Sequence, residues 1–233
     1  PNGGPVLAFD KESGVELIEV QDGPFTYAFK DLNGNGEVDV YEDWRLDTEA
    51  RAQDLAETMV ADGEEGIAAI AGLMLYSSHQ SVPSEELTDA QKTFLDEDNL
   101  RPVLITSVES PEIAAKWNNN AQAFVEGLGY GIPINTSSDP RHGASGKSDL
   151  EYIAGQGGTI SLWPDSIGLA ATFDPDIVER FGDIASQEYR ALGIATALSP
   201  QIDLATEPRW SRVSGTFGEN VELDIDMARA YVD

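Results

Sequence analysis

The order of apolar runs and amphipathic segments constrains the fold of this chain more than any other feature. Short apolar runs, typical of buried strands, alternate with longer segments in which apolar residues recur every three to four positions, as on one face of a helix. The predicted strands are 67–76, 102–106, 131–138 and 194–202, and the predicted helices are 47–61, 110–126, 174–193 and 224–231. This alternation predicts a parallel α/β sheet built from βαβ units. An open doubly wound sheet and a (β/α)8 barrel are both candidates, and about four strand–helix units make half of such a barrel.

Charge and cysteine content exclude several classes of function. The chain of 233 residues has 14 Lys and Arg against 42 Asp and Glu, which gives a formal net charge of −28. Duplex nucleic acid and anionic membranes are poor partners for such a surface, because binding to them requires a surplus of basic residues. The absence of cysteine excludes disulfides, thiolate catalysis and Cys-ligated metals. No apolar stretch approaches the roughly 18 residues of a membrane-spanning helix, so we expect no membrane insertion.

The acidic residues are unevenly distributed. Between Ala52 and Gln91 there is no lysine or arginine, although this segment contains many Asp and Glu residues. A solvated surface that promotes solubility accounts for this pattern, and adaptation to a salty or cation-rich exterior is the alternative.

Residues 31–42 match the twelve-residue calcium loop of EF-hand proteins. A hard divalent cation takes six to eight oxygen ligands, and Gly36 at the sixth position permits the sharp turn. The segment before the loop looks extended, which predicts one structural Ca²⁺ outside a paired EF-hand domain. An Asn/Gly-rich turn that matches by chance is the alternative. The predicted ligands are Asp31, Asn33, Asn35, Asp39, Glu42 and the main-chain carbonyl of Glu37.

One carboxylate pair, Asp203 and Glu207, could be interpreted as the machinery of glycosyl transfer. A retaining pair lies about 5–5.5 Å apart across the scissile bond. Two carboxylates on one short segment are difficult to aim at opposite sides of a sugar. We therefore interpret them as partners for structural ion pairs with Arg209 or Arg212.

Acids, arginines and a tryptophan follow two of the predicted strands. Residues 137–143 follow the third strand and residues 205–212 follow the fourth. Ligands of parallel α/β folds bind at the carboxyl ends of the strands, so both segments are expected at one site. Charged side chains hydrogen-bond to hydroxyl groups, and an aromatic ring covers the C–H face of a sugar. A polyhydroxylated ligand is one interpretation, and a packed Arg–Asp network under a loop is the other.

At these residues the sequence resembles glycoside hydrolase family 3, which includes β-glucosidases, β-xylosidases and related exo-acting enzymes. Three stretches carry the resemblance: KDLNGNGEVDVYEDWR at 30–45, GIP…DPRHG at 131–143, and the run from WPDSIGLAATFDP at 163–175 through ALSPQIDLATEPRWSR to GTFGE, which ends at 219. The resemblance implies an α/β fold that is the first part of a (β/α)8-type (TIM) barrel. It also divides the chain into an N-terminal segment, 1–45, which carries the calcium loop, and an incomplete part of the barrel, 46–233.

The resemblance also implies roles for single residues. Asp139 falls where the family has an aspartate that binds sugar hydroxyls, and Arg212 falls where it has an arginine that reaches the same ring. Arg141 and His142 are neighbours of that aspartate. We expect them either to contact the substrate directly or to act on it through Asp139. The family's Lys-His pair, its nucleophilic Asp in a Ser-Asp-Trp context and its acid/base Glu have no counterpart in this chain. We therefore expect no catalytic residue here.

The expected function is the hydrolysis of terminal non-reducing β-D-glucosyl residues by a retaining mechanism, with this chain supplying part of the sugar-binding site. The expected partners are a β-linked oligosaccharide or glucoside and the remainder of the enzyme. The expected location is secreted or periplasmic. The alternatives are a β-xylosidase or other exo-β-glycosidase of the family, and a non-catalytic carbohydrate-binding or calcium-stabilised module derived from the fold.

Overall fold

The computed structural model describes residues 6–138, 153–154 and 160–233. These residues belong to two compact units, which we describe one at a time. Unit 1 comprises Pro1–Ser77, Leu87–Pro102 and Asn119–Ile134, and unit 2 comprises Ser78–Glu86, Val103–Asn118 and Asn135–Asp233. None of the helices in the described residues has the length and hydrophobicity needed to span a lipid bilayer.

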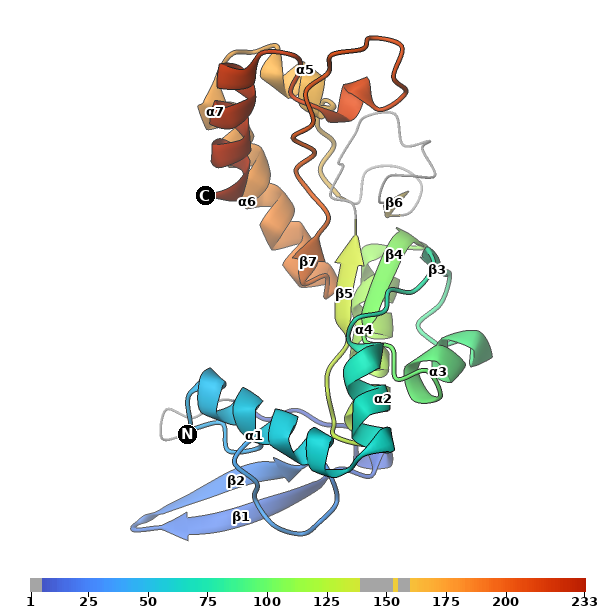
Figure 1. Cartoon of the computed structure of the whole chain (residues 1–233), viewed down its shortest axis with the longest axis vertical. Coiled ribbons are helices and arrows are strands. Elements are labelled where there is room, and N and C mark those ends of the chain that lie inside the picture. Colours follow the sequence, from blue (N-terminus) through green and yellow to red (C-terminus); the bar gives the residue numbers. More distant parts are fainter. Residues whose placement is uncertain (1–5, 139–152, 155–159) are drawn as a thin grey trace. The chain divides into compact units, whose positions relative to one another are not determined.

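Unit 1 combines a β-hairpin with helices. Its elements are η1 (Lys11–Ser13), β1 (Glu16–Asp22), β2 (Phe25–Asp31), α1 (Thr48–Ala61), α2 (Glu64–Gly72), α3 (Asp89–Asp96) and the second half of α4 (Pro111–Glu126). The strands β1 and β2 pair antiparallel along their whole length (Figure 1). Phe29 of β2 is fully buried and stacks on Trp44 with ring centroids 5.8 Å apart. Trp44 Nε1 donates a hydrogen bond of 2.9 Å to the carbonyl of Ala28, so the hairpin is tied to the segment that follows residues 31–42.

Helix α2 replaces a predicted strand, and the prediction of a strand at 67–76 is wrong. A short apolar run does not distinguish a strand from a buried helix by its pattern alone. The run contains three alanines and follows two glutamates, which favours a helix with acids at its positive end. Gly66 lies where a Cβ atom would come within 1.7 Å of the carbonyl oxygen of Met59. The absence of a side chain therefore lets α2 pack directly on the end of α1.

Unit 2 contains a parallel sheet and a group of helices. Its elements are β3 (Gln80–Val82), β4 (Pro102–Val108), β5 (Asn135–Ser138), β6 (Ile153–Ala154), α5 (Ser166–Ala170), α6 (Pro175–Leu192), β7 (Thr196–Ala197), η2 (Val213–Gly215), α7 (Val221–Val232) and the first half of α4. The strand order is β3-β4-β5-β7, and β6 also pairs with β4. The pairs β3–β4, β4–β6 and β5–β7 are parallel, which confirms the predicted type of sheet.

Two strands are shorter than predicted, whereas the helices agree better. The predicted strands 131–138 and 194–202 are reduced to β5 and β7. Pro133 and Pro200 interrupt these segments, and proline has no amide proton to donate to a ladder. The helix predicted at 174–193 is confirmed as α6, with Asp174 as its N-cap and Gly193 as its C-cap. Helix α7 begins three residues earlier than predicted, after the N-cap Asn220.

The helices of unit 2 pack around one hydrophobic cluster. Phe181 of α6 lies between Trp163 and Tyr231, with ring centroids 5.4 and 5.5 Å from it. A Cβ atom on Gly182 would come within 2.8 Å of the carbonyl oxygen of Tyr231, so α6 and α7 approach closely at this point. The buried members of the cluster are Leu169, Ala170, Val178, Phe181, Ala185, Phe217 and Met227.

A buried asparagine fixes the position of β5 within unit 2. Asn118 of α4 is 3% exposed. Its Nδ2 donates to the carbonyl oxygens of Ala114 at 3.2 Å and of Leu192 at 2.8 Å. Its Oδ1 accepts a hydrogen bond of 2.6 Å from Thr136 Oγ1. One side chain thus joins α4, the end of α6 and β5 through fully satisfied polar contacts.

Candidate functional site

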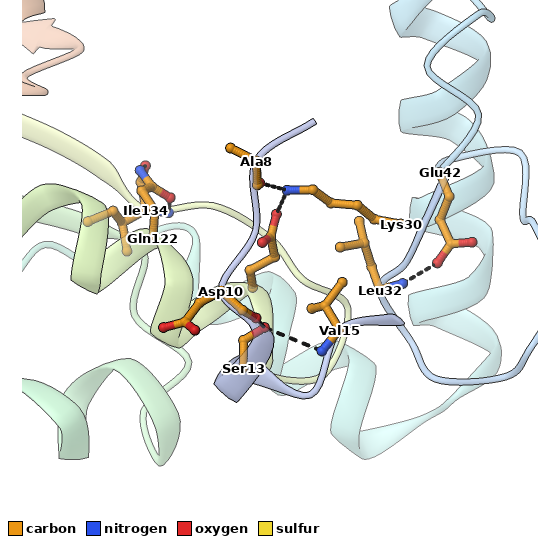
Figure 2. A network of polar contacts seen from close by, with 10 residues as sticks. Ala8, Asp10, Ser13, Val15, Lys30, Leu32, Glu42, Gln122 and Ile134 are labelled. Carbon is orange, nitrogen blue, oxygen red and sulfur yellow. Dashed lines mark hydrogen bonds and ion pairs between the residues drawn. The ribbon is translucent and has the colours of Figure 1, made fainter. Parts of the chain in front are cut away.

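The calcium-type loop at residues 31–42 is folded around two buried carboxylates. Asp31, at the end of β2, and Glu42 are 7% and 5% exposed. The carboxylate of Asp31 accepts two backbone N–H groups from the middle of the loop, at 2.9 and 3.1 Å. The carboxylate of Glu42 accepts the backbone N–H groups of Leu32 at 2.6 Å and of Asp39 at 3.0 Å; Figure 2 shows the Leu32 contact. The extended segment predicted before the loop is confirmed as β2.

The other predicted ligands gather around Asp39. The amide groups of Asn33 and Asn35 donate to Asp39 Oδ2 at 2.7 and 2.9 Å. Glu37 has an exposed side chain, in keeping with a predicted role for its carbonyl alone. In the described part of the chain, no group of three or more Asp, Glu or His side chains is placed to hold a metal ion. The donor types suit a hard cation, but an ion would have to displace the amide contacts to Asp39.

The buried acids of this loop lie close enough to affect one another's ionisation. Burial raises the pKa of Glu42, and so does the charge of Asp39 and Asp31, whereas backbone hydrogen bonds lower it. The hydroxyl of Tyr41 is buried and has no hydrogen-bond partner. Its pKa is raised above the usual range for tyrosine, first by burial and then by the neighbouring Glu42. A cation would offset the repulsion between these acids.

The carboxyl ends of β5 and β7 lie next to each other in unit 2. Ser137 pairs with Thr196 and Ser138 pairs with Ala197 in parallel register. The backbone N–H of Leu198 donates to the carbonyl of Ser138 at 3.0 Å, which extends the contact beyond the strands. The segments that follow the two strands therefore start at the same edge of the sheet, as the sequence predicts.

Two polar side-chain atoms of unit 2, one on Arg212 and one on Ser138, are buried without a partner. Arg212 lies on the segment after β7 and is the N-cap of η2. Its Nε is buried and makes no hydrogen bond, and the same is true of the hydroxyl of Ser138, the last residue of β5. A buried donor without a partner costs about 1–3 kcal/mol. Arg212 thus retains hydrogen-bonding capacity for a ligand.

Three of the four predicted substrate-binding residues are not described. Asp139, Arg141 and His142 lie outside the described residues. Their roles stay predictions.

The predicted ion pairing of Glu207 is confirmed, whereas that of Asp203 is not. The guanidinium of Arg209 donates to both carboxylate oxygens of Glu207 at 2.9 and 2.8 Å. The hydrogen bonds from Arg209 lower the pKa of Glu207 to about 2. Within the described residues, Asp203 makes no ion pair. The pKa of Asp224 of α7 is raised, first by burial and then by the negative charge of Asp203.

Residues 68–233 match the glycosyl hydrolase family 3 N terminal domain. The chain belongs to glycoside hydrolase family 3. It is 41% identical over 226 residues to a periplasmic β-glucosidase/β-xylosidase of Dickeya chrysanthemi, an alignment that covers 94% of this chain and 33% of that protein. It is 48% identical over 129 residues to β-glucosidase C of Emericella nidulans, which covers 55% of this chain and 20% of that protein.

Solved structures support the fold of this family 3 chain. A fungal multi-domain family 3 β-N-acetylglucosaminidase superposes with a TM-score of 0.60 at 19% identity, over 71% of this chain and 19% of that chain. At this identity the likeness concerns the fold alone. The chain spans about a third of the length of the first relative and a fifth of the second.

Asp224 of α7 is a buried carboxylate that the sequence pattern does not single out. Its position in the first turn of a helix, two residues before Asp226, is typical of a solvated acid at a helix N-terminus. No local signal distinguishes the buried residue from its exposed neighbour.

Proposed function

We propose that this family 3 chain is the N-terminal portion of an exo-acting β-glycosidase that removes terminal non-reducing β-D-glucosyl residues with retention of configuration. The observation that carries the proposal is the unpartnered Nε of Arg212, on the segment after β7, whose carboxyl end lies beside that of β5. Asp139 follows β5 directly in the sequence. A carboxylate and a guanidinium at neighbouring strand ends can share the hydroxyl groups of one sugar ring.

A β-xylosidase is the second candidate, because the Dickeya relative is named for both activities. In the complete enzyme, we expect kcat/KM for a nitrophenyl β-glucoside to exceed that for the matching β-xyloside. The anomeric configuration of the sugar released first, followed by proton NMR, tests retention. A preference for the xyloside would overturn the glucosyl assignment, and release of the α-anomer would overturn the mechanism.

The sheet of unit 2 is proposed to be the first part of a (β/α)8 barrel, with residues 1–45 as a separate N-terminal segment. β7 ends the described strand order, and parallel sheets are normally covered along their edges and faces. A groove of about 400 Å³ runs beside it, lined by Tyr189, Arg190, Ile194 and Ala197 among others. The remainder of the enzyme is proposed to cover this edge.

A structural Ca²⁺ is proposed at residues 31–42. The ligands are those predicted above, and the support is the spacing of the donors together with the buried carboxylates of Asp31 and Glu42. The ion would neutralise these acids and stabilise the loop that follows β2. A periplasmic or secreted location is proposed from the name of the Dickeya relative.

A further inference from the structure

Two Asn-Gly pairs lie in the loop at residues 31–42. The first is Asn33-Gly34 and the second is Asn35-Gly36. In such a pair the backbone nitrogen of the glycine can attack the side-chain amide carbon of the asparagine, because glycine has no Cβ atom to obstruct the approach. Asparagine is among the residues that are chemically labile in proteins. The loop therefore contains two candidate sites for spontaneous deamidation.

The asparagine side chains of the two pairs are held in the same way. Asn33 Oδ1 accepts the backbone N–H of Asn35 at 3.1 Å, and Asn35 Oδ1 accepts that of Glu37 at 2.7 Å. Both amide groups donate to Asp39 Oδ2, at 2.7 and 2.9 Å. The two glycines have similar φ angles, +70° and +80°, and a Cβ atom on either would meet no atom within 4 Å. These features do not favour one pair over the other.

The N–H groups of the two glycines differ. Gly36 N–H donates to Asp31 Oδ2 at 2.9 Å, and Asp31 is 7% exposed. Within the described residues, Gly34 N–H donates no hydrogen bond. The glycine nitrogen must lose its proton to attack. Loss of the proton from Gly36 would break a charged hydrogen bond and leave two negative charges in contact, a cost that Gly34 does not carry.

We propose that Asn33 is a site of spontaneous deamidation, and that Asn35, although more exposed, is protected by the hydrogen bond that the glycine after it makes. The nitrogen of Gly34 gives its proton to a base in the solvent and forms a bond to Cγ of Asn33. The bond between Cγ and Nδ2 breaks, and Nδ2 takes up a proton from water and leaves as ammonia. Water then opens the resulting five-membered imide at either carbonyl, which gives aspartate or isoaspartate at position 33.

The product alters the contacts of the loop. The new carboxylate at position 33 would lie where an amide group now donates to Asp39. A hydrogen bond would thus be replaced by repulsion between two carboxylates. The inference does not depend on the Ca²⁺ proposed for the same loop, because it rests on hydrogen bonds between the loop's own groups.

Peptide mapping of the complete protein tests the proposal. The protein is incubated with EDTA at mildly alkaline pH, below its melting temperature, and a sample digested before incubation corrects for deamidation during digestion. Trypsin cleaves after Lys30 and Arg45, so one peptide carries both pairs, and fragmentation in the mass spectrometer locates the gain in mass. We expect Asn33 to react at least about tenfold faster than Asn35, because giving up a hydrogen bond to a charged group slows a reaction by about that factor. Isoaspartate should be among the products, since direct hydrolysis of the amide gives aspartate alone.

The free peptide of residues 31–45 is the control for intrinsic reactivity, and its two pairs should react at similar rates. In the folded protein, Asn33→Gln should remove the main product, whereas the matched variant Asn35→Gln should retain it. Equal rates at the two asparagines, faster reaction at Asn35, or no reaction at either would overturn the proposal. The same preference for Asn33 in the free peptide would overturn it too, because the neighbouring sequence would then set the rates.

Discussion

At the scale of single residues, two arginines three positions apart have opposite environments. The side chain of Arg209 is 88% exposed and holds Glu207 in an ion pair. Arg212 is half-buried, and its Nε has no partner. Ion pairs as exposed as this one contribute little to stability. An unsatisfied buried donor, by contrast, gains a hydrogen bond when a ligand brings an acceptor to it.

This contrast predicts different kinetics for two matched variants of the complete enzyme. Arg212→Ala should lower kcat/KM for a nitrophenyl β-glucoside roughly 10- to 100-fold, since a charged hydrogen bond to the sugar is worth about 1.5–3 kcal/mol. Arg209→Ala should stay within about threefold of the unmodified enzyme, because its ion pair is exposed. Equal losses in both variants would show that Arg212 has no special role at the sugar.

Asp139 is the second residue expected to hold the sugar. Asp139→Ala should lower kcat/KM sharply, by roughly 10-fold or more. The sugar hydroxyl groups that donate hydrogen bonds to this carboxylate would be left unpaired in a closed site. Asp226→Ala, on the exposed face of α7, is the control for loss of one negative charge. Kinetics of Asp139→Ala that match those of the control would remove Asp139 from the site.

At the scale of elements, capping residues predict the type and the ends of an element more reliably than apolar runs do. Helix α6 could be placed from the sequence because Asp174 and Gly193 define its ends. Helix α2 could not be placed from its apolar pattern, because that pattern alone does not distinguish a helix from a buried strand. The shared sheet edge at the carboxyl ends of β5 and β7 could also be predicted, because the alternation of strands and helices indicates a parallel sheet. The burial of Asp224 depends on tertiary packing, which no local pattern reports.

The N-terminal segment is held by one partly buried ion pair. Lys30 of β2 pairs with Glu126 at the end of α4, and its Nζ also donates to the carbonyl of Ala8 at 2.5 Å (Figure 2). Both charged side chains are less than one-fifth exposed, at 18% and 19%. The pair joins residues 96 positions apart in the sequence. Loss of one partner would leave a poorly hydrated charge.

Lys30→Met should therefore destabilise the hairpin by about 1–3 kcal/mol, measured as faster hydrogen exchange of the β1–β2 peptides. Lys11→Met, at an exposed position of η1, should have no such effect. The double variant Lys30→Met/Glu126→Leu should recover part of the loss, since two apolar side chains can replace an ion pair. A single variant as protected as the control would contradict the anchoring role.

Calcium removal tests the loop at residues 31–42. EDTA should speed hydrogen exchange of the 31–42 peptide and lower the melting temperature, because an ion that binds only the folded state stabilises it by mass action. Glu42→Gln should abolish this EDTA effect, whereas Glu37→Gln should retain it, since residue 37 is expected to contribute only its carbonyl. Indifference of the unmodified loop to EDTA would favour the chance Asn/Gly turn.

At the scale of the whole molecule, each unit exposes large apolar side chains to solvent. In unit 1, Met74 is 81% exposed and Tyr76 is 54% exposed; in unit 2, Phe173 is 76% exposed and Ile202 is 56% exposed. Exposed groups of this size mark surfaces that other protein covers. We therefore expect residues 1–233, produced alone, to be poorly soluble and inactive despite the net charge of −28. A monodisperse monomer in size-exclusion chromatography that cleaves a nitrophenyl β-glucoside would contradict this.

We infer that this chain helps to bind the sugar and that the nucleophile lies outside residues 1–233. A 2-deoxy-2-fluoro-β-glucoside traps the glycosyl-enzyme intermediate of a retaining enzyme, and mass spectrometry of the digested complete protein locates the label. We predict a labelled carboxylate on a peptide outside residues 1–233. A label on Asp203, Glu207 or any other residue of this chain would contradict this division of roles.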